Sequence, residues 1–364
     1  MSSGILTNIK IAGIACVVPD NRKDLIEYYD KFGIEKVLEF SRKTGVNSRC
    51  ISFEEQTSSD LCYVAAERLI EHLDYKKESF DVVIFITQTP DYRLPASACL
   101  IHKRLGLKRE CIAFDVNLGC SGYVFGIHLV ASIMQHPSVK RGLLLAGDTM
   151  NKVVSNDDRS TAMLFGDSGS ATILERTDKS SDEIKFSLKT DGKGFKHIIV
   201  PSGAFRNRND KTDKYEFAEG IIRSDYDLFM SGLDVFEFTV YDVADSINEF
   251  CDTYHIQNDN IDMYVLHQAN IFILKNIAKR THIPLAKLPI SMDIYGNTSV
   301  TSIPLTICDA CERQKLEGDI RLLCSGFGVG LSWGIITMLV NAKNCLPIFY
   351  SNDYYTDGRL EKIV

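Results

Sequence analysis

No segment of the sequence approaches the roughly 18 uninterrupted apolar residues that a helix needs to cross a membrane. The N-terminus also lacks a cationic stretch followed by an apolar core, which is the pattern of a secretory signal. We therefore expect a cytoplasmic protein with no membrane insertion.

Positive charge is in short supply as well. The chain has 41 Lys and Arg against 48 Asp and Glu, which gives a net charge of -7 at pH 7. Nucleic-acid-binding domains normally carry a basic excess or a basic stripe. We therefore expect no nucleic-acid partner.

The sequence shows neither a linker nor a disulfide framework. No Pro-, Ser- or Gly-rich tract interrupts it, and its 11 cysteines are an odd number scattered through apolar surroundings. Cys308 and Cys311 have the C-x-x-C spacing of redox and zinc motifs, but no second pair or histidine cluster lies nearby. We interpret them as buried core residues and expect no metal site.

What the sequence contains instead is an alternation of strand-length apolar runs and helix-length amphipathic stretches. This pattern predicts an α/β fold whose strands are buried on both faces. In the first half the predicted strands are 82–86, 112–116 and 142–146, and the predicted helices are 58–73 and 121–135. In the second half the predicted strands are 263–266 and 320–324, and the predicted helices are 269–280 and 302–315.

The repeated alternation predicts two α/β halves, residues 1–176 and 177–364. Residues 177–225 are polar and turn-rich, so we expect an insertion or loop there. A mixed tail follows residue 341, and the pattern assigns it no role.

Cys120 stands out among the cysteines because it lies between the strand 112–116 and the helix that starts near 121. The free N–H groups and partial positive charge of a helix N-terminus favour a thiolate, which is the nucleophilic form of cysteine. Gly119 and Gly122 permit a tight turn around it. The turn alone fits a buried structural cysteine equally well.

Two further segments favour the nucleophile. His267 follows the strand 263–266 and precedes a helix, and Asn297 lies in a polar turn before another helix. In an α/β sheet, ligands bind outside the carboxyl ends of the strands, and all three residues would lie at such ends. A lone histidine is more often structural, so the hypothesis depends on the three residues together.

Six motifs in order resemble the β-ketoacyl-acyl-carrier-protein synthase III family, the initiating condensing enzymes of the thiolase superfamily. The resemblance spans residues 8 to 340. The interval from His267 to Asn297 is 297 - 267 = 30 residues, as in the family. The motifs are Thr44-Gly45-Val46 with Arg49 after it, and the segments 115–122, 165–171, 267–270, 295–299 and 328–334.

The resemblance implies a thiolase-like fold, in which the two pseudo-repeated halves form a layered α-β-α-β-α sandwich, and it implies a homodimer. The first half would carry the nucleophilic cysteine, and the second half the histidine and the asparagine. An acyl-CoA would acylate Cys120, and a malonyl unit on acyl carrier protein or on coenzyme A would then lose carbon dioxide and condense with it. The product would be a β-ketoacyl thioester, and no cofactor would be needed beyond coenzyme A thioester as substrate.

The resemblance also assigns roles to individual residues. His267 and Asn297 would stabilise the enolate, because both are neutral donors, and the backbone N–H groups of Cys120 and Gly330 would form a second oxyanion hole. The residues implied in coenzyme A or substrate binding are Arg49, Arg159, Leu94 and Asn270, with Leu94 reaching across the dimer into the partner's acyl pocket. Those implied in docking the carrier protein are Lys275, Lys279 and Arg280.

Two positions depart from the family pattern. Phe272 replaces an arginine that helps to dock the carrier protein, and Glu39 replaces a tryptophan that stacks on the adenine of coenzyme A. These replacements put the usual mode of carrier docking and of nucleotide binding in question.

Three alternatives stay open. A thiolase that does not decarboxylate would use a second cysteine, for which Cys324 near the final glycine turn is the candidate. A non-catalytic partner subunit would usually have lost the nucleophile. The Gly166-Asp167-Ser168-Gly169 motif imitates a serine protease, although the rest of such an enzyme is missing.

Overall fold

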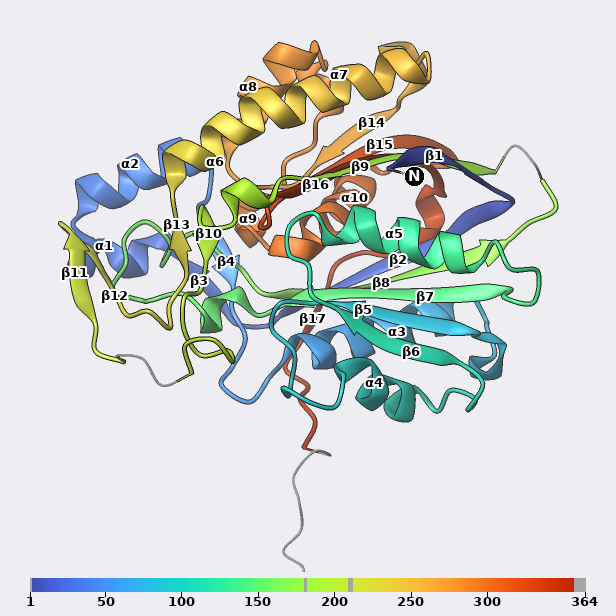
Figure 1. Cartoon of the computed structure of the whole chain (residues 1–364), viewed down its shortest axis with the longest axis horizontal. Helices are drawn as coiled ribbons and strands as arrows, with labels where there is room; N and C mark the ends of the chain where they lie inside the picture. Colours follow the sequence, from blue (N-terminus) through green and yellow to red (C-terminus); the bar gives the residue numbers. More distant parts are fainter. Residues whose placement is uncertain (1, 180–181, 209–211, 357–364) are drawn as a thin grey trace, which may run out of the picture.

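The computed structural model describes residues 2–179, 182–208 and 212–356, and within them a six-stranded and a five-stranded sheet form the frame (Figure 1). The six-stranded sheet has the order β17 (Phe349–Ser351), β2 (Ile9–Pro19), β8 (Ser168–Arg176), β7 (Arg141–Asp148), β5 (Val82–Ile86) and β6 (Ile112–Val116). The five-stranded sheet has the order β1 (Ser3–Thr7), β9 (Glu183–Thr190), β16 (Ser332–Asn341), β15 (Asp319–Gly328) and β14 (Met263–Leu266).

Helices cover both sheets and separate them, which makes five layers (Figure 1). α5 (Gly122–Ile133) and α10 (Ser302–Gln314) lie between the sheets and share one apolar core with both. α3 (Ser58–His72) and α4 (Ser97–Leu105) cover the outer face of the six-stranded sheet. α7 (Ala244–Thr253) and α8 (Ile271–Thr281) cover the outer face of the five-stranded sheet. The predicted α-β-α-β-α layering is confirmed.

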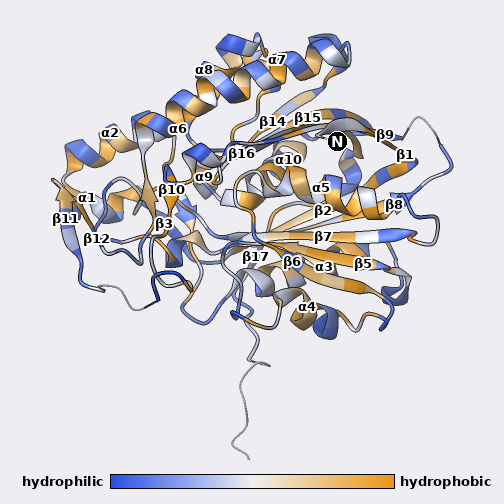
Figure 2. Cartoon of the chain, viewed as in Figure 1, coloured by the Kyte–Doolittle hydropathy of each residue, from blue (hydrophilic) through white to orange (hydrophobic). Residues whose placement is uncertain are grey.

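The hydropathy of a helix agrees with the layer in which it lies (Figure 2). α5 lies between two sheets, and its residues are apolar nearly all round, as such a position requires. α7 and α8 have one face in contact with a sheet and alternate between apolar and polar residues. The burial of each helix therefore follows from its sequence pattern.

The two halves repeat one topology. In the first, β2 pairs antiparallel with β8, β8 antiparallel with β7, and β7 parallel with β5. In the second, β9, β16, β15 and β14 follow the same sequence of pairings. In each half the connection from the first to the last strand of the series ends with an outer helix, α3 in the first half and α7 in the second. This is the pseudo-repeat that the resemblance implies.

The remaining elements lie at one end of the sandwich (Figure 1). α6 (Gly232–Phe238) continues through a π-helical turn into α7. The other short elements are α1 (Tyr29–Phe32), α2 (Ile34–Thr44), α9 (Met292–Tyr295), and the strand pairs β3 (Arg22–Asp24) with β4 (Ser48–Cys50), β10 (Ile198–Ile199) with β13 (Phe229–Met230), and β11 (Tyr215–Ala218) with β12 (Ile221–Arg223).

The strands and helices expected from periodicity are confirmed, but the expectation of a loop or insertion over 177–225 is partly wrong. β9 runs from Glu183 to Thr190 within that range and pairs with β16 inside the main sheet. Its apolar side chains alternate with charged ones, so it lacks the continuous apolar run of a strand buried on both faces. Residues 180–181 and 209–211 of the expected insertion lie outside the described residues.

Two edge strands do not follow the predicted boundary at residue 176. β1, at the N-terminus, pairs with β9 of the second half. β17, in the tail, pairs parallel with β2 of the first half. Each end of the chain thus adds an edge strand to the opposite half, while the tail residues 357–364 lie outside the described part.

Candidate active site

Cys120 lies in the turn between β6 and α5, where the sequence placed it, and 8% of its surface is exposed. The glycine turn after β15 packs directly against it. A Cβ atom on Gly328 would lie 2.7 Å from the Cys120 Cβ and 3.0 Å from its Sγ. Glycine at 328 therefore leaves the room that the thiol occupies.

The surroundings of Cys120 shift the pKa of its thiol upward. Burial raises the pKa of its thiol to about 12, and the negative charge of Asp148 acts in the same direction. The Ser299 hydroxyl, 4.0 Å from Sγ, and the backbone N–H groups of Cys120 and Val329 oppose this shift but do not overcome it. The helix N-terminus is expected to favour a thiolate; in the free protein, desolvation of the thiol acts against the local N–H donors.

His267 follows β14 directly, and its backbone N–H donates to the Ser325 carbonyl of β15 at 2.8 Å. Its Nδ1 lies 2.7 Å from the Ser302 hydroxyl, at the start of α10. When that hydroxyl donates to Nδ1, the ring proton lies on Nε2. Burial lowers the pKa of His267 to about 3, so the imidazole is neutral at physiological pH.

Asn297 lies in the turn between α9 and α10, and its amide orientation follows from its neighbours. Its Oδ1 accepts the Ser299 backbone N–H at 2.9 Å, which leaves the NH2 group as a donor. Its backbone N–H donates to Leu164, and its carbonyl accepts from Gly166. A Cβ atom on Gly166 would overlap the Tyr295 carbonyl oxygen. Glycine at 166 therefore lets the two halves approach closely enough to hold the Asn297 turn.

One cavity of about 70 Å³ brings Cys120, His267 and Asn297 together. Its remaining walls are mainly apolar side chains from both halves of the chain. They include Met150, Leu164, Phe165, Ile198, Leu228, Met230, Val235, Ile273, Phe327 and Val329. A nucleophile, two polar side chains and an apolar wall are what an enzyme that handles an acyl chain needs.

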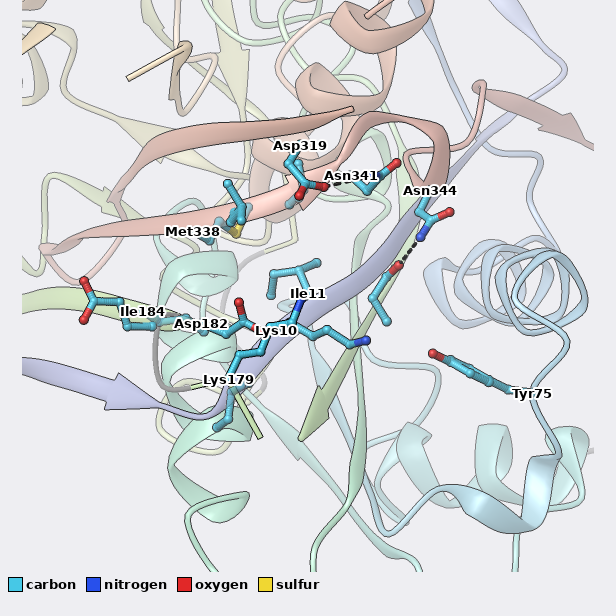
Figure 3. Close-up of a pocket in the computed structure, with 15 residues that line it drawn as sticks. Lys10, Ile11, Tyr75, Lys179, Asp182, Ile184, Asp319, Met338, Asn341 and Asn344 are labelled. Carbon is cyan, nitrogen blue, oxygen red and sulfur yellow. Dashed lines mark hydrogen bonds between the residues drawn. The ribbon is translucent and has the colours of Figure 1, made fainter. Parts of the chain in front are cut away.

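A second cavity, of about 230 Å³, lies elsewhere on the molecule (Figure 3). It lies beside β2, β9 and β16, with Lys10, Tyr75 and Asn341 on its walls. Lys10 pairs with Glu175 at 3.2 Å, and Tyr75 donates to the same carboxylate at 3.0 Å. None of the three candidate catalytic residues lines this cavity.

Two family models match the chain. One is described as 3-oxoacyl-[acyl-carrier-protein (ACP)] synthase III and matches residues 114–192, and the other as its C-terminal part and matches residues 251–340. Beta-ketoacyl-[acyl-carrier-protein] synthase III of Desulfitobacterium hafniense is 30% identical over 335 residues, which cover 90% of this chain and 97% of that protein. The same enzyme of Streptococcus agalactiae is 34% identical over 304 residues, 82% of this chain and 90% of that one.

A solved structure extends the likeness. The 3-oxoacyl-(acyl-carrier protein) synthase of Burkholderia xenovorans is 36% identical, with a TM-score of 0.90 over 96% of this chain and 99% of that one. The chain belongs to the β-ketoacyl-[acyl-carrier-protein] synthase III family. It has the thiolase fold and is an initiating condensing enzyme of the acyltransferase type.

Within this synthase III chain, the glycine turn contributes a different residue from the one expected. Val329 lines the cavity, and its backbone N–H lowers the pKa of the Cys120 thiol, whereas Gly330 does not line the cavity. The peptide between Gly330 and Leu331 is cis. Val329 is therefore the better candidate for the second N–H of the oxyanion hole, and motif position alone did not distinguish it from its neighbour.

Arg49 does not fit its expected contact with coenzyme A, because its side chain is fully buried. Its guanidinium donates to the Phe165 carbonyl at 3.1 Å and to the Tyr28 hydroxyl. Phe165 lines the cavity, so Arg49 supports the wall of the site from behind. A buried and an exposed arginine have the same appearance in a sequence motif.

The other residues expected to bind substrate lie nearer the surface. Arg159 is half-buried. The pKa of Glu39 is lowered mainly by Lys43, which forms an ion pair with Glu39 at 2.6 Å, and to a smaller extent by the charge of Arg159. Asn270 lines the cavity and also caps α8, since its Oδ1 accepts the Ile273 N–H at 2.7 Å. Leu94 is 80% exposed, on a loop outside the cavity.

The three basic residues of the expected docking surface lie on α8, and all are exposed. Arg280 is engaged within the chain, because it donates to Asp245 at 2.9 and 3.0 Å and lies over the Tyr241 ring. Phe272 is 56% exposed and stacks on Phe236, with the ring centroids 5.2 Å apart.

The geometry does not favour the alternative sites. Ser168 is a buried residue of β8, and its hydroxyl contacts Thr301, so the protease-like motif is a packing feature between the halves. Cys324 is buried within β15 and does not line the cavity, which argues against its use as a second catalytic cysteine. Cys308 and Cys311 lie in the core on α10.

Proposed function

We propose that the protein joins an acyl group from coenzyme A to a malonyl unit carried by acyl carrier protein, or by coenzyme A, in a decarboxylative Claisen condensation. The observation that carries the proposal is the single cavity with a thiol, a neutral imidazole and an oriented carboxamide on its walls. The names of the family's relatives support the use of an acyl carrier protein.

In the first half-reaction, the Cys120 sulfur attacks the thioester carbonyl of acyl-CoA. The carbon–sulfur bond to coenzyme A breaks, and the proton of the Cys120 thiol ends on the departing coenzyme A sulfur. The N–H groups of Cys120 and Val329 act on the Cys120 thiol and would stabilise the oxyanion of this step. Since burial raises the pKa of the thiol, its deprotonation is assigned to the substrate complex.

In the second half-reaction, the malonyl unit loses carbon dioxide and leaves an enolate, which attacks the acyl-cysteine. The Nε2–H of His267 and the NH2 group of Asn297 would donate to the enolate oxygen. Neither is a strong acid, so they stabilise the enolate without protonating it. The Cys120 sulfur leaves with the electron pair and takes up a proton, which restores the thiol.

We further propose that the enzyme acts as a homodimer in the cytoplasm, needs no metal or cofactor beyond its thioester substrates, and binds the carrier through Lys275 and Lys279. The proposal of a dimer is supported by β6. This strand is the last of its sheet, and its residue Ile112 is 49% exposed. An exposed sheet edge with apolar residues favours pairing with a second copy. No helix in the described part of the chain is both long and apolar enough to cross a bilayer.

Mass spectrometry of the intact protein after incubation with acyl-CoA tests the proposal. We expect one acyl adduct on the wild-type protein and none on Cys120→Ser. Addition of malonyl-acyl carrier protein should then remove the adduct and release a β-ketoacyl product. An acyl adduct that persists on the Cys120 variant, or an adduct that the malonyl unit never discharges, would contradict the proposal.

A further inference from the structure

Gln88 is a polar residue of the Cys120 cavity that the proposed chemistry does not use. It lies two residues beyond the end of β5. A Cβ atom on Gly119 would overlap the Gln88 Oε1 atom, so the carboxamide lies against the backbone of the residue that precedes the nucleophile. The group is therefore adjacent to the place where the acyl chain is attached.

The backbone of Gln88 is held firmly. Its N–H donates to the Asp148 Oδ1 at 2.7 Å, and Asp148 is fully buried. The Thr87 hydroxyl donates to the same oxygen at 3.2 Å. The anchored backbone therefore holds the start of the Gln88 side chain at the mouth of the Cys120 turn.

The carboxamide itself is poorly satisfied. Its Nε2 donates to the Asn117 Oδ1 at 3.4 Å, which is a long hydrogen bond. Among the described residues, none donates to its Oε1 within hydrogen-bonding distance. It therefore retains both a donor and an acceptor for a ligand in the cavity.

Most other polar groups that line the cavity are occupied or have a catalytic role. Thr239 donates to the Phe236 carbonyl at 2.9 Å, and the Asn270 Oδ1 is occupied as the cap of α8, which leaves only its NH2 group. His267 and Asn297 serve the proposed condensation, and Ser299 faces the Cys120 sulfur. The remaining wall is apolar and offers no partner to an oxygen atom of the acyl group.

We propose that Gln88 selects acyl donors that carry a hydroxyl or keto oxygen close to the thioester carbon. Its Nε2–H would donate to that oxygen, and its Oε1 would accept from a hydroxyl. This inference rests on the proposed function and gives its substrate class. A saturated acyl chain offers the amide neither partner, so a hydroxyl or keto group adds a hydrogen bond that the saturated chain lacks.

The test compares 3-hydroxybutyryl-CoA with butyryl-CoA, which have the same number of carbons. The rate of Cys120 acylation is followed by intact mass at several donor concentrations. A net hydrogen bond of about 1 kcal/mol corresponds to a preference of roughly fivefold for the hydroxylated donor. Gln88→Leu, of similar size but apolar, should abolish or reverse that preference.

Thr239→Val is the matched control, because Thr239 also lines the cavity but its hydroxyl is occupied. This variant should keep the wild-type ratio. A wild-type preference for butyryl-CoA, equal rates, or an unchanged ratio in Gln88→Leu would overturn the inference while the acylation of Cys120 stands. If neither 3-hydroxybutyryl-CoA, butyryl-CoA nor any other acyl-CoA acylates the folded protein, that result would instead contradict the proposed function itself.

Discussion

The two halves share a topology but end differently at the active site. The first half continues beyond β5 to a further strand, β6, and its end leads into the turn that holds Cys120. The second half has β14 as its last strand, and its end holds His267. Cys120 thus comes from one copy of the repeat, and His267 and Asn297 come from the other. The site is complete only when the two copies pack together.

The same burial has opposite effects on the two groups. It raises the pKa of the Cys120 thiol to about 12 and lowers the pKa of His267 to about 3. In each case burial disfavours the charged form, which is the thiolate for cysteine and the imidazolium for histidine. Both shifts therefore favour the neutral form of the group near pH 7.

The largest expected effect concerns the first half. Because the pKa of Cys120 is well above neutral, the rate of its alkylation by iodoacetamide should rise about tenfold per pH unit between pH 7 and 10. Peptide mass spectrometry would measure it, with Cys120→Ala to identify labelling at exposed Cys99. A plateau that begins near pH 7 would show that a thiolate already exists and would remove the contrast between the halves.

Loss of the donors in the second half should separate the two half-reactions. We expect His267→Ala and Asn297→Ala each to slow condensation by about 10²- to 10³-fold, the usual effect of removing one donor to a developing oxyanion. Acylation of Cys120 should change by only a few-fold. Single-turnover assays with acyl-CoA alone, and then with the malonyl substrate, measure each step. An equal loss in both steps would mean that the halves do not divide the chemistry in this way.

The contact between the halves can be weakened at Gly166. In Gly166→Ala the new methyl group meets the Tyr295 carbonyl oxygen, and overpacking of this kind typically costs about 1–3 kcal/mol in the free energy of unfolding. Urea unfolding measures the loss. Gly192→Ala is the matched control, because nothing lies within 4 Å of its Cβ position. Equal stability of the two variants would show that the halves tolerate separation at this point.

The smallest expected effect is on the pH dependence of the condensation rate, which should be nearly flat. With a pKa of about 3, His267 stays neutral from pH 5 to 8, so its titration should change the condensation rate of a preformed acyl-enzyme by less than about twofold over that range. An acid limb with a midpoint near pH 6.5 would contradict this.

His267 should also make the free energy of unfolding depend on pH. Unfolding restores the pKa of His267 to about 6.5, so the unfolded chain binds the extra proton first. The contribution of His267 to the free energy of unfolding should therefore fall as the pH drops from 6.5 toward 3. Comparison of the wild-type protein with a His267→Gln variant in urea measures this contribution, and a rise in stability on acidification would have the wrong sign.

Periodicity predicted the central strands and inner helices well, because segment 82–86 is apolar throughout and segment 121–135 is mainly apolar. It failed for β9, whose apolar residues alternate with Lys185 and Lys189, a pattern similar to that of a polar loop. The edge strands β1 and β17 were also missed. Their partners come from the opposite end of the chain, and local pattern carries no information about them.

The sequence by itself determined the α/β class, the layers implied by the family resemblance, and the identity of Cys120, His267 and Asn297 as candidates. Each depends on a local pattern or on a spacing along the chain. Only the tertiary structure decided that Arg49 is buried, that Val329 rather than Gly330 lines the cavity, and that Gln88 lies beside the nucleophile. These findings depend on contacts between segments that are distant in the sequence. There the burial and the neighbours of a side chain, and not its residue type, decide whether it can reach a ligand.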